Sequence, residues 1–378
     1  MYSKERTKQL AEAFYGEELR EFEGLEIYRC NFRSQAADVL PGADTYYCPK
    51  HQKKFKRNGT FYNDVETITE DIHAKDISVE ENREFTYHLM KPKDGLPAKK
   101  ITFLFHGFNE KNWDKYYSWG ERICRQTGSA VVFFPIAFHM QRAPALWSNP
   151  REMFRLSENR KKRFPNVINS SLSNVAISMR LHAMPQRYVW SGLQTYYDII
   201  QLIEEFKEGT TLVNRDFSDT KVLLFCGGAV FNRFTPVSKF ILDSEANLAL
   251  YSYLVEHFDS FLAQDPRLRH YIEEDHTAGK VLHAMLNFLN LREFREGLFK
   301  ESAPDIHAIT LKQDKVIPPF EIINTLKGAY GDIDINVEVL DFDHEYSHEN
   351  PFPQKRVDPA KVNESYNMVF DKACNFLN

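Results

Sequence analysis

The chain has 378 residues, of which 43% are hydrophobic and 14% aromatic, so it can build a sizeable core and is not a disordered chain. Its net charge of −5 is mild and argues against a general nucleic-acid binder. No apolar run approaches the roughly 18 residues of a membrane span. Residues 1–10 are polar and lack the apolar core of a secretory signal, and the five cysteines are scattered and odd in number. These features predict a cytoplasmic protein with reduced thiols and no membrane partner.

Residues 1–83 are predicted to form an N-terminal accessory segment with a packing or lid role. Apolar positions in residues 4–22 have helical spacing, and Pro41-Gly42 marks a turn. Cys48 and His51 lack a matching second pair of ligands, so no metal site is predicted.

From about residue 84 short apolar runs alternate with amphipathic segments, a pattern typical of an α/β fold with a mainly parallel sheet and helices on both faces. We therefore treat residues 84–378 as one domain. A helix is predicted over residues 191–206, with Ser191 and Gln194 as a capping box, and Asp358-Pro359 opens a terminal helix. The predicted strands are 85–90, 101–105, 130–134, 222–225, 307–311 and 337–342.

A long insertion at about residues 136–190 shows no strand pattern and is predicted to form a helical cap over the carboxyl ends of the strands. Residues 136–187 carry nine Lys or Arg against two Glu, a net charge of +7, opposite in sign to the whole chain. This charge could favour an anionic small-molecule substrate. The alternative is that residues 160–163 are simply a solvated basic run.

Three short motifs could carry chemistry. An apolar strand over residues 101–105 runs directly into His106-Gly107-Phe108, where glycine lets the backbone approach an anion closely. The strand at 307–311 is followed by Asp314 in the turn before Pro318. The last strand is followed by two histidines, His344 and His348, the second of which comes 34 residues after Asp314.

The order of these motifs resembles the α/β-hydrolase superfamily over about residues 84–378. A closer resemblance, carried by 106–110, 134–139, 191–195 and 225–228, is to an uncharacterised bacterial branch of it. The resemblance implies that Phe108 supplies an oxyanion-binding N–H at the loop formed with His106 and Gly107. It also implies that Asp314 orients a catalytic histidine. His348 fits the usual spacing beyond the last strand better than His344, which remains the alternative.

The nucleophile elbow, the superfamily's most diagnostic feature, is missing, because the chain has no Gly-x-Ser-x-Gly. Cys226 is the nearest candidate, but Leu224 is large for the crowded position before it, and Pro236 would cut short the following helix. After the oxyanion strand the superfamily has five more parallel strands, whereas four are predicted here. A strand-elbow-helix unit of about 30 residues is therefore expected to be absent around residues 209–214. Either the chain lacks residues that the natural protein has, or it is a degenerate relative.

The resemblance implies hydrolysis of an ester, thioester or amide by acyl transfer, with no metal or organic cofactor. With Cys226 as nucleophile the protein would be a thiol hydrolase. The alternative from another class is a catalytically degenerate binding or interaction protein on a hydrolase scaffold, since a fold does not fix a function. A nucleotide-binding fold would need a glycine-rich phosphate loop after the first strand, and none is present there.

Overall fold

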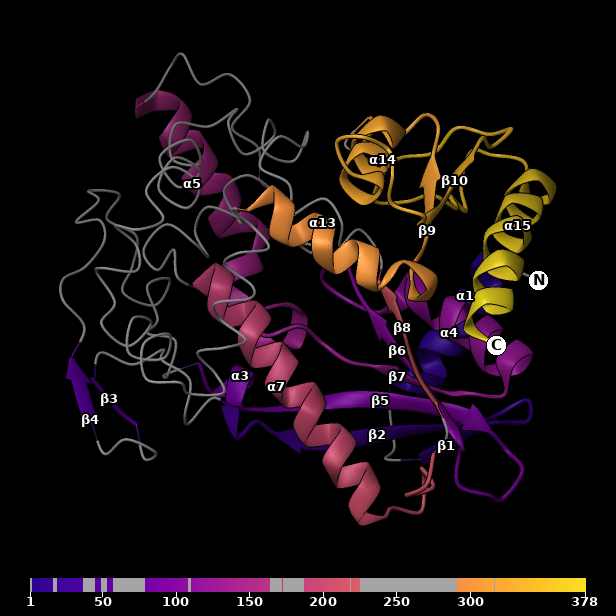
Figure 1. Ribbon diagram of the computed structural model, residues 1–378. Coiled ribbons are helices and arrows are strands. Elements are labelled where there is room, and N and C mark those ends of the chain that lie inside the picture. Colours follow the sequence, from indigo (N-terminus) through magenta and orange to yellow (C-terminus); the bar gives the residue numbers. More distant parts are fainter. Residues whose placement is uncertain are drawn as a thin grey trace.

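A six-stranded sheet lies at the centre of the computed structural model (Figure 1). The structure describes residues 2–15, 19–36, 45–48, 53–56, 79–107, 110–163, 172, 187–217, 219–224, 291–315 and 317–378. In spatial order the strands of the sheet are β1 (Leu19–Phe22), β2 (Leu25–Arg33), β5 (Glu84–Pro92), β7 (Ala130–Phe133), β6 (Lys100–Phe105) and β8 (Asp219–Leu224).

The sheet is mixed, and the prediction of a mainly parallel sheet was wrong in this respect. β6 pairs in parallel with β7 and with β8, whereas β1–β2, β2–β5 and β5–β7 are antiparallel. The difference arises in the N-terminal segment, where Glu23 and Gly24 both have positive φ and join β1 to β2 in a tight hairpin. The predicted helix over residues 4–22 therefore ends early: α1 spans Lys4–Phe14.

Two smaller sheets lie outside the main one. β9 (His307–Leu311) and β10 (Asn336–Leu340) form a parallel pair, and β3 (Thr45–Cys48) and β4 (Lys53–Lys56) an antiparallel pair. All six strands expected from the apolar runs are present, with ends shifted by up to three residues. For β6 and β7 a continuous apolar run predicted the strand because such strands are buried on both faces.

Helices cover both faces of the six-stranded sheet. On one face α1, α4 (Asp114–Thr127) and α15 (Pro359–Leu377) share a core with strand residues such as Leu104 and Phe133. On the other face α7 (Arg187–Glu208) packs against Phe103 and Phe105 through Leu202 and Phe206. Successive residues of β6 thus point to opposite layers. The other α-helices among the described residues are α3 (Glu80–Arg83), α5 (Pro150–Arg163), α13 (Arg292–Glu301) and α14 (Pro319–Lys327). Among the described helices, none is both long and apolar enough to span a membrane.

Two predicted helix starts had different outcomes. Asp358 is the N-cap of α15, as predicted, and its carboxylate accepts a hydrogen bond from the Ala360 N–H. The capping box of Ser191 and Gln194 was wrong, because α7 begins before both residues. Instead the Ser191 hydroxyl donates to the Ala137 carbonyl, and Gln194 accepts from the Asn82 amide.

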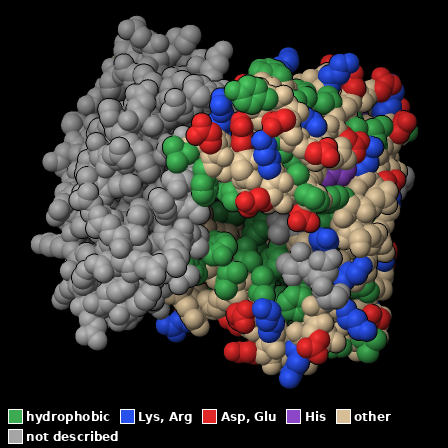
Figure 2. Space-filling model, viewed as in Figure 1, with side chains coloured by type: hydrophobic (Ala, Val, Ile, Leu, Met, Phe, Trp, Pro, Cys, Tyr) green, Lys and Arg blue, Asp and Glu red, His purple; other side chains and the backbone are tan. Residues whose placement is uncertain are grey.

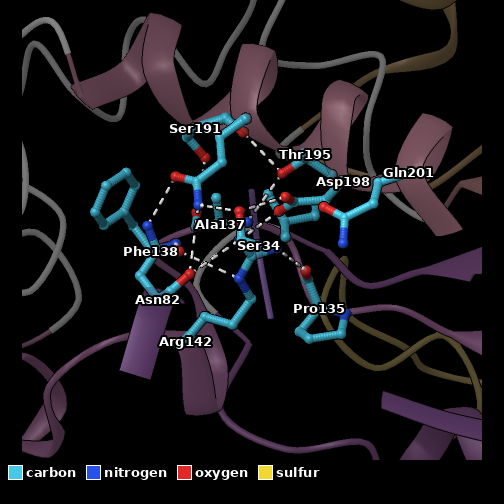
Figure 3. Close-up of polar contacts among 12 residues, drawn as sticks. Ser34, Asn82, Pro135, Ala137, Phe138, Arg142, Ser191, Thr195, Asp198 and Gln201 are labelled. Atoms are coloured by element: carbon cyan, nitrogen blue, oxygen red, sulfur yellow. Dashed lines mark hydrogen bonds and ion pairs between the residues drawn. The ribbon is translucent and has the colours of Figure 1, made fainter. Parts of the chain in front are cut away.

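Gln194 belongs to a buried polar network that joins four distant segments (Figure 3). At its centre Arg142 Nη2 lies 2.6 Å from Asp198 Oδ2, and both side chains are 0% exposed. Asp198 also accepts a hydrogen bond from Ser34, which follows β2, and Arg142 donates to Asn82 Oδ1 and to the Pro135 carbonyl. The guanidinium stacks on the Phe85 ring, 3.9 Å from its centroid. The network fixes the start of the cap insertion against α7 and the N-terminal segment.

Candidate functional site

Asp314 and His348 come together at the end of the β9–β10 pair. The two strands are in register up to Leu311 and Leu340, so the loops that follow them leave from the same edge. His348 Nδ1 lies 2.7 Å from Asp314 Oδ2, and the two side chains are only 14% and 12% exposed. The other carboxylate oxygen, Oδ1, accepts a hydrogen bond from the Ile317 N–H at 2.9 Å. The carboxylate is therefore held from both sides.

This contact determines which nitrogen of the His348 ring can accept a proton. An ionised carboxylate only accepts hydrogen bonds, so Nδ1 must carry the proton that it donates to Asp314. In the neutral ring the lone pair is then on Nε2. An Asp–His pair with this tautomer is the arrangement of a general base and its orienting acid.

His344, the alternative histidine, occupies a buried structural position. It is 9% exposed, stacks on Phe342 with ring centroids 5.2 Å apart, and its Nε2 lies 3.1 Å from the Pro351 carbonyl. Its Nδ1 lies 3.3 Å from the Ser365 hydroxyl on α15. Both ring nitrogens of His344 are thus engaged in holding the loop against α15. It is His348, and not His344, that forms the hydrogen bond with Asp314.

The end of the β6 strand is equally well fixed. His106 is 1% exposed; its Nε2 accepts the Ile136 N–H at 3.0 Å, and its Nδ1 donates to the Gly107 carbonyl at 2.9 Å. These bonds define a neutral ring that ties the end of β6 to the start of the cap insertion. The Gly107 N–H donates to the Tyr116 hydroxyl at 2.7 Å. Phe108, the predicted oxyanion donor, lies outside the described residues.

A chain of polar contacts joins the end of β6 to the loop that carries His348. The Tyr116 hydroxyl donates to Glu110 at 3.3 Å, and the same carboxylate forms an ion pair with Lys115. Lys115 Nζ in turn donates to the Glu349 carbonyl, next to His348 in the chain, at 2.7 Å. Sequence reasoning missed Glu110, Lys115 and Tyr116, because 234 positions separate Lys115 from Glu349 and no short-range spacing reveals the contact.

Cys30, Cys124 and Cys374 are not activated thiols. Burial raises the pKa of Cys30 and Cys374 to about 11 and that of Cys124 to about 12, so all three are protonated near neutral pH. Cys226, the candidate nucleophile, lies outside the described residues. Among the residues described, no group of three or more His, Cys, Asp or Glu could hold a metal ion.

The positive charge of the cap insertion is partly neutralised. Arg142 is wholly buried against Asp198, and Arg155 and Lys161 form ion pairs with Glu152 and Glu158 at 2.9 Å. A surface field from this insertion would thus come from fewer than the nine basic residues counted in the sequence.

A model of a family of unknown function, DUF6051, matches the chain over residues 1–216 and 213–378. The chain belongs to this family. The two matched segments overlap at 213–216 and together span the whole chain. No curated protein shows a significant match.

The solved structures similar to this one include esterases. A cold-adapted esterase from an Arctic intertidal metagenomic library has 8% identity and a TM-score of 0.37, over 96% of this chain and 99% of the other. An acetyl xylan esterase from Paenibacillus sp. R4 has 14% identity and a TM-score of 0.36, over 98% and 92%. Acetyl xylan esterase 1 from Thermoanaerobacterium sp. JW/SL YS485 has 12% identity and a TM-score of 0.31, over 98% and 92%. At such scores the similarity supports no argument about fold or activity.

Proposed function

We propose that the protein is an α/β-hydrolase-type enzyme that hydrolyses an ester, thioester or amide by acyl transfer. The observation that carries the proposal is the largely buried contact of 2.7 Å between Asp314 and His348, at the edge where two parallel strands end. Ligand sites of α/β sheets lie beyond the carboxyl ends of the strands.

In this mechanism His348 Nε2 takes the proton of the attacking group and later returns it to the leaving group. Asp314 holds the ring and stabilises its charged form. The oxyanion of the tetrahedral intermediate is bound by the backbone N–H of Phe108, the residue after the His106-Gly107 turn. Within the chain Cys226 is the candidate attacking group, since it follows β8 by two residues in the sequence and β8 pairs beside β6.

The test is turnover of matched p-nitrophenyl ester, thioester and anilide substrates by the full chain and two variants. His348→Gln is expected to lower kcat/KM by about 10²–10⁴-fold, the usual contribution of a general base. Asp314→Asn should also lower it, because the ring loses the tautomer that leaves Nε2 as acceptor.

Asp341→Asn is the matched control for the acid. Asp341 lies just after β10, is about half exposed and pairs with Lys312 at 2.8 Å, so the substitution changes a carboxylate of the same region without touching His348. Equal activity losses in Asp314→Asn and Asp341→Asn, or full activity in folded His348→Gln, would contradict the proposed roles.

The second candidate is a catalytically degenerate protein that binds a small molecule on the same scaffold. The absence of Gly-x-Ser-x-Gly favours it. It predicts no turnover dependent on His348, together with saturable binding of a substrate analogue that the His348→Gln variant retains.

We further propose that the site prefers anionic compounds, drawn by the basic insertion that the sequence predicts as its cap. The charge pairing described above leaves Arg151 and Lys162 as exposed basic side chains among those described on α5. Turnover or binding of matched neutral and anionic compounds should diverge at low ionic strength and converge in salt. Equal behaviour at every salt concentration would remove the preference.

A further inference from the structure

The turn that follows β7, residues 135–140, contains two strained residues. Phe138 and Met140 have φ values of 63° and 48°, a left-handed conformation that bulky side chains rarely adopt. Glycine adopts it without strain, yet no glycine occurs between Gly128 and Gly192. Strained residues of this kind persist only where the surrounding contacts fix them, and they gather at functional sites.

The contacts that fix this turn come from the buried polar network (Figure 3). The Ala137 N–H donates to the Thr195 hydroxyl at 2.9 Å, and the Ala137 carbonyl accepts the Ser191 hydroxyl at 2.8 Å. Both of these partners lie on α7. The Phe138 N–H donates to Asn82 Oδ1 at 3.2 Å, so α3 holds the turn as well.

Asn82 is itself fixed by two neighbours. Its Oδ1 also accepts from Arg142 Nε at 3.2 Å, and its Nδ2 donates to Gln194 Oε1 at 2.8 Å. Arg142 Nη1 donates to the Pro135 carbonyl at 3.0 Å. Charged side chains of both signs lie on the outside of the molecule in Figure 2, whereas Arg142 and Asp198 are 0% exposed. Buried polar groups as fully bonded as these hold the main chain of the turn in one position.

The same turn contacts His106 at the end of β6. The Ile136 N–H donates to His106 Nε2 at 3.0 Å. Because this nitrogen accepts, the ring proton lies on Nδ1, which donates to the Gly107 carbonyl at 2.9 Å. The rings of His106 and His139 also lie 5.6 Å apart, and His139 Nδ1 lies 2.9 Å from the Ala137 carbonyl. The turn therefore sets both the tautomer of His106 and the direction of the Gly107 carbonyl.

We propose that Thr195 and Asn82 are positioning residues for the oxyanion-binding loop, acting through the turn and His106; this point rests on the proposed function. The Gly107 carbonyl and the N–H that follows it belong to one planar peptide, so rotating this carbonyl away from His106 also rotates the donor. A misplacement of about 1 Å costs on the order of 10²-fold in rate. The strain of the turn follows from the same role, since the main chain must pass close enough to bond His106.

The first test compares Thr195→Val with Thr195→Ser in assays with p-nitrophenyl esters. Valine has the shape of threonine without the hydroxyl, so the Ala137 N–H loses its acceptor, whereas serine keeps it. Thr195→Val is expected to lower kcat about tenfold or more with little change in KM, because the displaced donor acts in the transition state. Thr195→Ser is expected to keep kcat close to the wild-type value. Equal losses in the two variants, or full activity in folded Thr195→Val, overturn the proposal.

The second test needs no turnover. Proton–nitrogen correlation spectra of histidine side chains show which ring nitrogen carries the proton, and the signals of His106 are identified by their loss in His106→Gln. We expect the Nδ1–H form in the wild type and changed His106 signals in Thr195→Val and Asn82→Ala. Gln201→Ala is the control, because Gln201 also lies on α7 but bonds the Arg33 carbonyl instead of the turn. Unchanged His106 signals in both network variants, or equal changes in the control, overturn the proposal.

Failure of this proposal and failure of the proposed function give different results. If the wild type hydrolyses no ester but the His106 signals change as expected, the hydrolase function fails and the coupling of the network to His106 stands. If turnover depends on His348 while the network variants change neither kcat nor the His106 signals, the coupling fails and the hydrolase function stands.

Discussion

The buried ion pair between Arg142 and Asp198 makes the sharpest prediction about stability. In Asp198→Ala the guanidinium of Arg142 remains fully buried, because Asn82, the Pro135 carbonyl and the Phe85 ring still hold it, but its counter-charge is gone. Breaking a buried pair in this way costs about 3–5 kcal/mol in the free energy of unfolding. The burial of Asp198 raises its pKa and the guanidinium opposes that rise, which shows how closely the two charges depend on each other.

The chain offers a control with the same geometry on the surface. Arg122 and Asp371 are also 2.6 Å apart, but their side chains are 33% and 52% exposed, so Asp371→Ala should cost less than about 1 kcal/mol. Removing both buried charges, as Arg142→Met with Asp198→Leu, should recover most of the loss, because no unpaired charge is then left in the core.

Urea unfolding followed by tryptophan fluorescence measures all four proteins. The order expected in the free energy of unfolding is wild type and the Asp371→Ala control highest, the double variant next, and Asp198→Ala lowest. If Asp198→Ala costs no more than Asp371→Ala, burial does not govern the value of this pair and the reasoning is wrong.

Three further outcomes are expected. A Cβ added at Gly120 would lie 2.2 Å from Phe133 Cζ, so overpacking in Gly120→Ala should cost about 1–3 kcal/mol in the free energy of unfolding and lower the melting temperature. A Cβ at Gly297 meets nothing within 4 Å, so Gly297→Ala should raise the melting temperature slightly in the same thermal melts. Burial lowers the pKa of His88 from 6.5 to about 4, so its contribution to the free energy of unfolding is full above pH 6.5 and falls by about 3 kcal/mol as the pH falls toward 4. His88→Phe should flatten that part of a plot of urea midpoint against pH, and an unchanged plot would refute the assignment. Lys115→Met should lower kcat/KM about tenfold or more while leaving the melting temperature within a few degrees, and a loss of stability without a change in activity would contradict a positioning role.

The central strands could be predicted because burial on both faces leaves an unbroken apolar run in the sequence. β2 was missed although its signal is present: Leu25 and Ile27 alternate with polar residues, and Gly24 precedes them at a hairpin turn. The helical spacing assumed for residues 4–22 concealed β1, which spans Leu19–Phe22 and pairs with β2.

The pairing of Asp314 with His348 was expected from the resemblance to the α/β-hydrolase superfamily, and the parallel strands β9 and β10, which end at the same edge, bring the two loops together. His344 contacts Pro351 and Ser365, and neither contact could be predicted from the sequence. Ser365 lies on α15, and the packing of this helix depends on the whole core. The Arg142–Asp198 pair was hidden for a similar reason: Arg142 was counted among the basic residues of the cap insertion, and nothing in its local sequence distinguishes a buried arginine from a surface one.

The contacts of Tyr2 have a consequence for the order in which the chain folds during synthesis. Its ring stacks on Tyr366 with centroids 4.5 Å apart, and its N–H donates to Asn363, 361 positions later. The core that α1 shares with α4 and α15 can therefore close only after the last helix has left the ribosome. Until then the apolar face of α1 lacks its partner α15, and apolar surface left exposed in this way makes a nascent chain prone to aggregation.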